Sequence, residues 1–337
     1  MKAIYLATPG KISVADVARP VRQDNEVLVK VKSMGICGSD ISAYLGTSPL
    51  VSYPRIIGHE LAGEVMEVPE GEAEISVGDR VVLEPYVYCG TCYPCRSNRT
   101  NCCEQLTVLG VHIEGGMSEY IAHPRHLVHK VPGDLSWKLM AMVEPLTISM
   151  HAVGRGKVKE GEHVVITGCG PIGLLAAQYA RAIGATPIIV DPVEERLRMA
   201  AEAGIPYTVN PVTADAVQTI RNITAGRMAE VVVEASGNAA AIRSSVDYVA
   251  YSGRISLVGY PKGETSLPTA LFTKKELDIV GARNSYRTFP DSICLIAAGE
   301  VDVSAVITKT IAFAEVPAVI QDIAARPGDY MKVIVEV

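Results

Sequence analysis

The feature that most constrains the fold is an alternation of short apolar runs with helical patterns, which begins near residue 155. Residues 164–167 read as a buried strand, and an Ala- and Leu-rich helical stretch follows at 174–183. Further strand patterns lie at 187–191, 207–209, 230–234, 254–258 and 277–280, with a second helix at 194–203. Strands that alternate with helices need crossover connections, so this part of the chain predicts βαβ units and a parallel sheet.

A glycine loop lies between the first of these strands and the first helix. Gly168, Gly170 and Gly173 form a G-x-G-x-x-G pattern that also contains Pro171 and Ile172. In such a loop the three glycines allow, in order, a tight turn, close approach of the backbone to a pyrophosphate, and close packing of helix on strand. The free N–H groups at the start of the helix attract phosphate. This loop therefore predicts a dinucleotide-binding site.

The acidic residue that such a site uses follows at the expected distance. Asp191 ends the second strand, about twenty residues after the loop, where an acid can hold the adenosine ribose. An acid at this position repels a 2′-phosphate, so NAD is favoured over NADP. Arg196 and Arg198 lie nearby and could weaken that preference. The alternative is a glycine turn that binds no ligand. It is disfavoured because the strand, the glycines, the helix and the acid all occur where a dinucleotide-binding site requires them.

The first 150 residues are expected to be rich in β-strands. Short patterns at 27–32, 63–68 and 79–83 are separated by Gly and Pro, which is more typical of a partly open barrel than of a helical bundle. A final strand pattern lies at 332–335. A chain of 337 residues is long enough for two domains. We expect one domain at 1–150 and 282–337, and a second at 151–281.

Four cysteines form a C-x-x-C-x-x-C-x7-C pattern within a lobe at 86–105. They are Cys89, Cys92, Cys95 and Cys103. Four thiolates at such spacing can close a tetrahedron around Zn²⁺, and a site without an open position is structural. Cys102 adjoins Cys103 and could compete as the fourth ligand. Disulfides are disfavoured because this large chain shows no secretion signal at its start.

A second metal site needs protein ligands and one open position. The candidates are Cys37, His59, Glu60 and Glu144, which offer a thiolate, an imidazole and one or two carboxylates. Such a set suits Zn²⁺ and leaves room for water or substrate. Each residue by itself is weak evidence for a metal site, because a single Cys or His is more often a packed core group. Sequence spacing does not establish that these side chains meet.

Composition excludes several classes of partner. The net charge is −6 and no basic run occurs, so nothing favours nucleic acid. Aromatic residues make up 5% of the chain, which argues against a surface for base stacking. No uninterrupted apolar stretch of about 18 residues is present, so no membrane span is expected. We expect a cytoplasmic protein.

Together these motifs resemble the zinc-dependent medium-chain alcohol dehydrogenases. The residues that carry the resemblance are Cys-Gly-Ser-Asp at 37–40, Gly-His-Glu at 58–60, the four-cysteine pattern, Glu-Pro-Leu at 144–146 and the glycine loop at 168–173, in that order over nearly the whole chain. Glu-Pro-Leu resembles the motif found at this position in the polyol and sugar dehydrogenase branch of the family. The segments at 110–117 and 281–285 resemble enzymes that oxidise sugar acids such as galactonate or idonate.

The resemblance implies an α/β protein with a GroES-like β-barrel catalytic domain and a Rossmann domain, holding one catalytic and one structural Zn²⁺ and using NAD. By this resemblance Cys37, His59 and Glu144 hold the catalytic zinc. Glu60 is either a fourth ligand or an acid that can swing in, and the choice stays open. Asp40 would accept a hydrogen bond from His59 and so fix its tautomer.

The implied reaction is the reversible oxidation of a secondary alcohol to a ketone. Zinc would lower the pKa of the substrate hydroxyl, and the hydride would move to the nicotinamide. Ser39 would pass the hydroxyl proton outward. Many relatives carry a histidine five residues after the zinc cysteine, where this chain has Ser42, so a longer relay needs water or another route.

For substrate contacts we expect Tyr44, His112, Arg283 and Asn284. Arg283 could pair with a carboxylate in bidentate fashion, as a sugar acid would require. Equally, the role of Arg283 and Asn284 could be limited to shaping the loop beside the nicotinamide. Tyr44 could line the pocket without binding the substrate through its hydroxyl. One rival interpretation is an L-threonine dehydrogenase, and another is a non-catalytic NAD-binding scaffold with structural zinc alone. Relatives pair sheet edges, so we expect a homodimer or homotetramer.

Overall fold

The computed structural model describes residues 1–261 and 263–337 and divides into two compact units. One unit comprises Met1–Glu144, Phe289–Ala297 and Ile307–Val337, and the other comprises Pro145–Thr288 and Ala298–Val306. Each has a buried apolar core of its own. The expected boundary at residue 150 falls inside helix α4 (Val143–Arg155). Residues 145–150, 282–288 and 298–306, which were expected in the first domain, group with the second unit.

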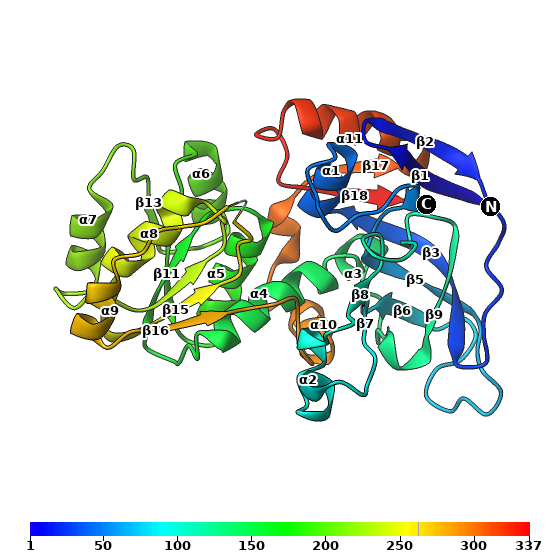
Figure 1. Cartoon of the computed structure of the whole chain (residues 1–337), viewed down its shortest axis with the longest axis horizontal. Coiled ribbons are helices and arrows are strands. Elements are labelled where there is room, and N and C mark those ends of the chain that lie inside the picture. Colours follow the sequence, from blue (N-terminus) through cyan, green and yellow to red (C-terminus); the bar gives the residue numbers. More distant parts are fainter. Residues whose placement is uncertain (262) are drawn as a thin grey trace. The chain divides into compact units, whose positions relative to one another are not determined.

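The first unit consists mainly of β-strands, as its sequence predicts (Figure 1). Its largest sheet has seven strands in the order β10-β6-β5-β3-β18-β17, with β9 also paired to β3. A second sheet has the order β2-β1-β4, and β7 pairs with β8. The strands are β1 (Lys2–Thr8), β2 (Lys11–Asp16), β3 (Glu26–Ile36), β4 (Arg55–Ile56), β5 (Glu60–Glu67), β6 (Arg80–Leu83), β7 (Tyr86–Val87), β8 (Thr107–Val108), β9 (Tyr120–Pro124), β10 (Val128–Lys130), β17 (Ile307–Ala312) and β18 (Lys332–Glu336).

Short helices connect these strands. They are α1 (Gly38–Tyr44), α2 (Tyr93–Arg96), α3 (Trp137–Met140), α10 (Phe289–Ala297) and α11 (Val316–Ala325), with 3-10 turns η1 (Thr100–Cys102), η2 (Arg125–Leu127) and η4 (Phe313–Glu315). Strand β3 is central, because β5 and β18 both pair with it in antiparallel register. Gly35 of β3 lies opposite Glu60 on one side and Ile334 on the other. Three distant parts of the chain therefore meet at one end of β3.

The second unit is a six-stranded parallel sheet in the order β13-β12-β11-β14-β15-β16, flanked by helices (Figure 1). This is the Rossmann order, and the predicted parallel sheet is confirmed. The strands are β11 (His163–Thr167), β12 (Thr186–Val190), β13 (Tyr207–Val209), β14 (Ala229–Glu234), β15 (Val249–Leu257) and β16 (Asp278–Gly281). The remaining elements are α5 (Pro171–Ala182), α6 (Glu194–Glu202), α7 (Ala216–Ile223), α8 (Ala239–Tyr248), α9 (Thr269–Lys275) and η3 (Val303–Val306).

The central strands β11 and β14 are apolar because helices cover both faces of a parallel sheet. Val164, Val165 and Ile166 of β11 are fully buried, as are the valines of β14. Continuous Val and Ile runs of this kind are what a doubly covered strand requires, whereas strands with one wet face alternate. The same apolar runs made these strands recognisable in the sequence.

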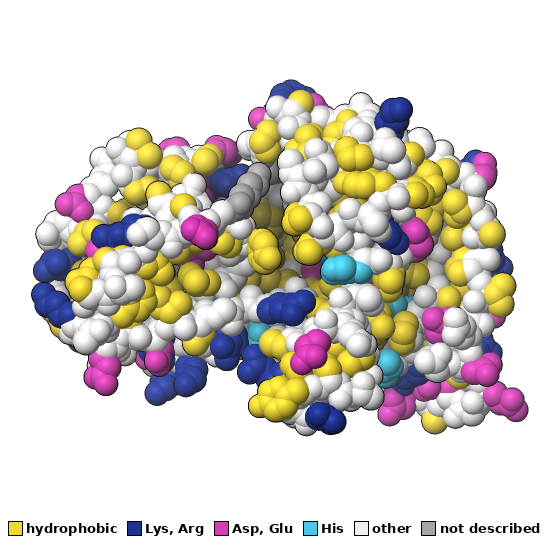
Figure 2. Space-filling view, viewed as in Figure 1, with side chains coloured by type: hydrophobic (Ala, Val, Ile, Leu, Met, Phe, Trp, Pro, Cys, Tyr) yellow, Lys and Arg dark blue, Asp and Glu magenta, His cyan; other side chains and the backbone are white. Residues whose placement is uncertain are grey.

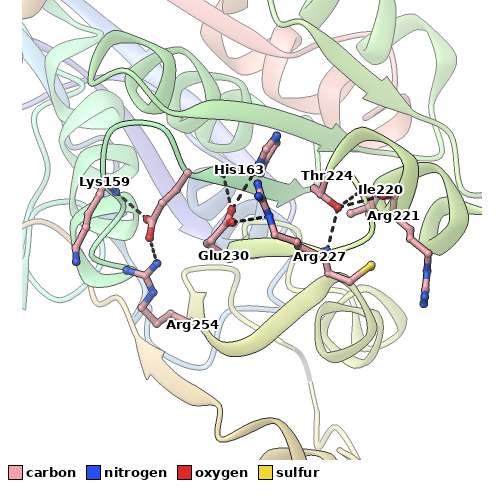
Figure 3. A network of polar contacts seen from close by, with 10 residues as sticks. Lys159, His163, Ile220, Arg221, Thr224, Arg227, Glu230 and Arg254 are labelled. Atoms are coloured by element: carbon pink, nitrogen blue, oxygen red, sulfur yellow. Dashed lines mark hydrogen bonds and ion pairs between the residues drawn. The ribbon is translucent and has the colours of Figure 1, made fainter.

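A polar network closes the end of this sheet where β11 and β14 begin (Figure 3). The backbone N–H of His163 donates to Glu230 at 2.8 Å, and the backbone N–H of Lys159 donates to Glu162 at 2.9 Å. Arg254 of β15 forms an ion pair with Glu162. Carboxylates here satisfy backbone groups and tie three neighbouring strands together.

The side chain of Gln178 links helix α5 to the segment 298–306. The amide of Gln178 in α5 donates to the carbonyl of Asp302 at 2.9 Å and accepts from its N–H, also at 2.9 Å. Gln178 is fully buried. One glutamine thus satisfies both backbone groups of a single residue.

Figure 2 shows Lys and Arg as well as Asp and Glu side chains on both units, with hydrophobic side chains between them. Over residues 1–261 and 263–337, no helix is long and apolar enough to cross a membrane.

Candidate metal and cofactor sites

The four-cysteine lobe forms a compact cluster of sulfur atoms. The Sγ atoms of Cys89, Cys92, Cys95 and Cys103 all lie within 4.8 Å of one another. Backbone N–H groups donate to these sulfurs, from Cys92 to Cys89 at 3.4 Å and from Cys89 to Cys103 at 3.4 Å. The N–H groups of Thr91 and Cys92 lower the pKa of Cys89 to about 6. Four sulfur atoms clustered in this way fit a structural Zn²⁺, which binds cysteines as thiolates.

Cys102, the competing candidate for fourth ligand, is not a member of this cluster. Its Sγ instead lies 3.8 Å from Nη2 of Arg99. The 3-10 turn η1 ends at Cys102 and presents the following residue, Cys103, to the other three sulfurs. The geometry therefore favours Cys103 as the fourth donor.

A second cluster is formed by Cys37, His59 and Glu60, whose candidate ligand atoms lie within 4.8 Å of one another. Cys37 follows the end of β3 and caps α1, whereas Glu60 begins β5 directly after His59. Because β3 and β5 are antiparallel neighbours, the end of one strand lies beside the start of the other. Sheet pairing thus brings together the two motifs that the sequence could only list separately.

The second cluster is buried and rich in negative charge. His59, Glu60 and Glu144 are between 2% and 6% exposed. Burial lowers the pKa of His59, but the charges of Cys37, Asp40 and Glu144 raise it well above its usual value. Burial also raises the pKa of Glu144 to about 7. The surroundings favour a positive charge at the centre, and the donor set of thiolate, imidazole and carboxylate fits Zn²⁺.

Glu144 lies outside the three-residue cluster and has its own partner. It stands in the first turn of α4, and its Oε1 accepts a hydrogen bond from the hydroxyl of Tyr86. Tyr86 is 4% exposed and belongs to β7, three residues before the first cysteine of the lobe. Sequence analysis missed Tyr86, because an isolated tyrosine before a cysteine motif carries no signal.

Glu60 is paired with a buried lysine that sequence analysis also missed. Nζ of Lys332 lies 2.6 Å from Oε1 and 2.8 Å from Oε2 of Glu60. It also donates to the carbonyl oxygen of Ile36 at 3.2 Å. Lys332 is 4% exposed and is 272 residues from Glu60 in sequence, so only the pairing of β18 with β3 brings them together.

The predicted bond between Asp40 and His59 is wrong for this structure. The carboxylate of Asp40 accepts from the backbone N–H groups of Cys37 at 2.9 Å and of Gly58 at 3.2 Å. Nδ1 of His59 is buried and has no hydrogen-bond partner among the residues described. Asp40 therefore braces the two ligand-bearing loops through their backbones, because those N–H groups lie within reach of its short side chain. It acts on His59 through charge.

Ser39 lies in the first turn of α1, two residues from Cys37. Its Oγ is buried and has no hydrogen-bond partner within the described part of the chain. A buried hydroxyl without a partner is costly unless a ligand or water completes its hydrogen bonds. The geometry is compatible with the predicted contact to a substrate hydroxyl.

Of the four expected substrate residues, two lie in the first unit and two in the second. Tyr44 ends α1 and packs against the core of the first unit. Nδ1 of His112 accepts a hydrogen bond from the N–H of Val108 at 3.1 Å, which closes the turn after β8. Arg283 and Asn284 follow β16 in the second unit, where Arg283 is exposed and Asn284 has a φ of 51°. Their substrate roles stay predictions.

The glycine loop has the geometry that its pattern requires. Gly168 has a φ of 95°, which favours glycine, at the turn out of β11. A Cβ at Gly173 would lie 1.8 Å from the carbonyl oxygen of Gly168, so only glycine permits this close packing. A Cβ at Gly170 would meet nothing within 4 Å, which leaves its backbone accessible. Helix α5 then begins at Pro171.

Asp191 is buried beside this loop. Its two carboxylate oxygens accept from the backbone N–H groups of Cys169 at 2.7 Å and Val193 at 2.8 Å. Asp191 therefore joins the loop after β11 to the turn after β12. Arg196 lies in the first turns of α6 and is half-buried. Contact of either residue with a ribose stays a prediction.

Comparison with known proteins relates both units to one family. Residues 23–133 match the alcohol dehydrogenase GroES-like domain, and residues 171–298 match the zinc-binding dehydrogenase domain. An uncharacterized zinc-type alcohol dehydrogenase-like protein of Haemophilus influenzae is 51% identical over 334 residues, covering 99% of this chain and 98% of that protein. The L-galactonate-5-dehydrogenase of Escherichia coli is 38% identical over 298 residues, covering 88% and 87%.

A solved structure is similar over the whole chain. It is the alcohol dehydrogenase rspB from Escherichia coli CFT073, complexed with the cofactor NADH. The TM-score is 0.93 at 32% identity, covering 100% of this chain and 99% of the other.

Proposed function

We propose, because this chain belongs to the zinc-type medium-chain alcohol dehydrogenases, that it reversibly oxidises a secondary alcohol of a sugar acid or polyol to a ketone with NAD. The observation that carries this proposal is the buried cluster of Cys37, His59 and Glu60 with Glu144 nearby. A buried, anionic set of thiolate, imidazole and carboxylate donors is suited to a catalytic zinc with one position open to substrate.

Each candidate residue has a role in this proposal. A zinc ion held by Cys37, His59 and a carboxylate would act as a Lewis acid that lowers the pKa of the substrate hydroxyl, and NAD would accept the hydride. Ser39 would take the hydroxyl proton through its buried Oγ. Since Ser42 stands where many relatives carry a histidine, a water molecule would continue the path.

The cofactor would be held by the second unit. The glycine loop of Gly168, Gly170 and Gly173 would receive the pyrophosphate at the start of α5. Asp191 would hold the adenosine ribose, with Arg196 nearby. The cysteine cluster at 89–103 would bind a second, structural zinc, so the protein would carry about two zinc ions per chain. We propose that the enzyme acts as a homo-oligomer in the cytoplasm.

Similarity to an L-galactonate-5-dehydrogenase supports a sugar acid as substrate. Arg283 would pair with its carboxylate, because a guanidinium binds a carboxylate with two parallel hydrogen bonds. Tyr44, His112 and Asn284 would contact the rest of the substrate. An L-threonine dehydrogenase would instead need an acidic residue for the substrate ammonium.

The decisive experiment follows NADH formation by the purified, zinc-loaded protein on a panel of hexonates, hexitols, pentitols and L-threonine. Turnover confined to one or two aldonates would support the sugar-acid proposal. Turnover of neutral polyols or of threonine would overturn that substrate but keep the zinc and NAD chemistry. The metal content distinguishes the enzyme from a non-catalytic scaffold. The enzyme would bind about two zinc ions per chain, and the scaffold about one.

A further inference from the structure

A second buried carboxylate lies beside the glycine loop, on the side opposite to Asp191. Strands β12 and β14 pair with β11 on its two sides, and Thr167, Val190 and Glu234 are level in these pairs. Asp191 directly follows β12, whereas Glu234 is the last residue of β14. Glu234 is fully buried, and neither the glycine pattern nor the mechanism proposed above includes it.

The carboxylate of Glu234 binds the loop that follows it. Its Oε1 accepts from the backbone N–H groups of Ser236 at 2.9 Å and Gly237 at 3.1 Å, and from the hydroxyl of Ser236. Its Oε2 lies 3.2 Å from the backbone N of Gly237. The hydroxyl of Thr167, at the end of β11, lies 3.5 Å from Oε1. One side chain thus fixes the turn by which the chain leaves β14.

The loop 235–238 packs directly against the glycine loop. A Cβ on Gly168 would lie 2.9 Å from Cβ and 3.1 Å from the backbone N of Ser236. The N–H of Ala235 also donates to the carbonyl oxygen of Thr167 at 2.9 Å. The end of β11 and the loop after β14 therefore touch through their backbones, and a shift of one would alter the surroundings of the other.

Gly259 confines the same loop from the side of β15. A Cβ on Gly259 would lie 2.1 Å from the backbone N of Gly237 and 2.6 Å from Oε2 of Glu234. The N–H of Gly259 donates to the carbonyl oxygen of Glu234 at 3.0 Å. Any side chain at this glycine would displace either Gly237 or the carboxylate, so the loop fits only in the position in which Glu234 holds it.

The strand order places this loop where a dinucleotide is expected to bind. From β11 the chain continues to β12 and β13 on one side, and then returns to β14 on the other side of β11. A Rossmann sheet binds its dinucleotide outside the carboxyl ends of the strands, in the crevice at this point of reversal. The glycine loop and loop 235–238 follow the two strands concerned, so they stand as the two walls of that crevice.

We propose that Glu234 is a positioning residue that sets the affinity for the cofactor by holding loop 235–238 against the glycine loop. Because Glu234 is fully buried, it acts without touching the cofactor. It also occupies the N–H groups of Ser236 and Gly237, which leaves the start of α5 to receive the pyrophosphate. The inference rests on the proposed function, since it concerns the same NAD site.

The test measures NADH binding to the full-length protein by the fluorescence of the bound cofactor. Glu234→Met keeps the length of the side chain and removes every acceptor. We expect its Kd for NADH to rise about tenfold or more, since a tenfold change corresponds to about one hydrogen bond to a charged group. Glu234→Gln retains one acceptor oxygen and should restore Kd to within about threefold of the parent value.

The number of binding sites separates positioning from a general structural role. A positioning role raises Kd and keeps one NADH site per folded chain, whereas partial unfolding lowers the number of sites and leaves Kd unchanged. Glu230→Met is the matched control, because Glu230 lies at the other end of β14 and also accepts a backbone N–H, from His163 at 2.8 Å. It should bind NADH as the parent does. An equal rise in Kd for the two Met variants, or no rise for Glu234→Met, would overturn the inference.

Gly259→Ala keeps the inference testable if Glu234→Met does not fold. It displaces Gly237 from the opposite side while the carboxylate of Glu234 remains, so we expect the same direction of change in Kd. An unchanged Kd in this variant would contradict a role for the position of the loop.

These outcomes separate the inference from the proposed function. If the parent protein does not bind NADH, the proposed cofactor and the inference fail together. If the parent binds NADH and the variants bind it equally well, only the inference fails. If Kd changes as expected but no sugar acid or polyol is oxidised, the substrate proposal fails and the inference stands.

Discussion

Gly35 and Glu60 face each other across the β3–β5 pair, so closely that a Cβ on Gly35 would lie 1.8 Å from Oε2 of Glu60. We therefore expect Gly35→Ala to displace the carboxylate from Lys332 and to lower the free energy of unfolding by about 1 to 3 kcal/mol, as overpacked buried sites do. Urea denaturation measures this change. Gly38→Ala is the matched control, because a Cβ there would meet nothing within 4 Å. Equal stability of the two variants would contradict the prediction.

Two adjacent cysteines provide a test of the structural zinc. Cys103 belongs to the four-sulfur cluster, whereas Cys102 faces Arg99. We expect Cys103→Ser to lower the zinc content from about two to about one ion per chain, because a closed site needs all four ligands. Cys102→Ser should retain both ions. Elemental analysis of the dialysed proteins measures the content, and loss of zinc from the Cys102 variant would contradict the assignment.

Because the imidazole of His123 is buried, we expect the free energy of unfolding to fall at acidic pH. Its Nε2 lies 2.8 Å from the carbonyl oxygen of Glu84, to which the neutral ring can donate. Burial, aided by His126 and His129, lowers the pKa of His123 to about 4 from 6.5. The unfolded chain therefore binds this proton first as the pH falls. Stability is complete above about pH 6.5 and is lost progressively toward pH 4, by about 3 kcal/mol at most.

The measurement is urea denaturation at pH 7 and pH 5. A His123→Gln variant cannot titrate but can still donate to the carbonyl of Glu84, so its stability should depend less on pH over this range. His126→Gln is the comparison, because His126 is exposed to a greater extent than His123. An unchanged pH dependence in the His123 variant would show that another group controls the acid sensitivity.

Asp191 is expected to influence both cofactor choice and loop geometry. Asp191→Asn removes the negative charge and one of the two oxygens that accept from Cys169 and Val193. We expect KM for NAD to rise by about tenfold or more and discrimination against NADP to shrink, because a charge that repels a 2′-phosphate is lost. Initial rates with both cofactors measure this. If NADP use stays unchanged while KM for NAD rises, Asp191 acts only by bracing the loop.

Much of the second unit could be predicted from the sequence, because its strands are continuous apolar runs bounded by glycine and helical patterns. The strand at 207–209 has the bounds of β13, and the glycine loop has the packing that its spacing predicts. The cysteine cluster was likewise predictable, since its ligands are local in sequence.

The surroundings of the second metal site could not be predicted in this way. Tyr86 and Glu144 are 58 residues apart, and Lys332 and Glu60 are 272 apart. No periodicity or spacing encodes such pairs, because they arise from strand pairing and from the packing of a helix start against a strand. The Asp40–His59 bond was wrong for a related reason, since backbone N–H groups nearer to Asp40 take its oxygens.

The position of Lys332 on β18 also affects the order in which the site can form during synthesis. Cys37, His59, Glu60 and Glu144 all leave the ribosome before the second unit, yet the counter-charge for Glu60 follows that unit. A nascent chain can therefore hold every proposed zinc ligand while the carboxylate of Glu60 still lacks its cation.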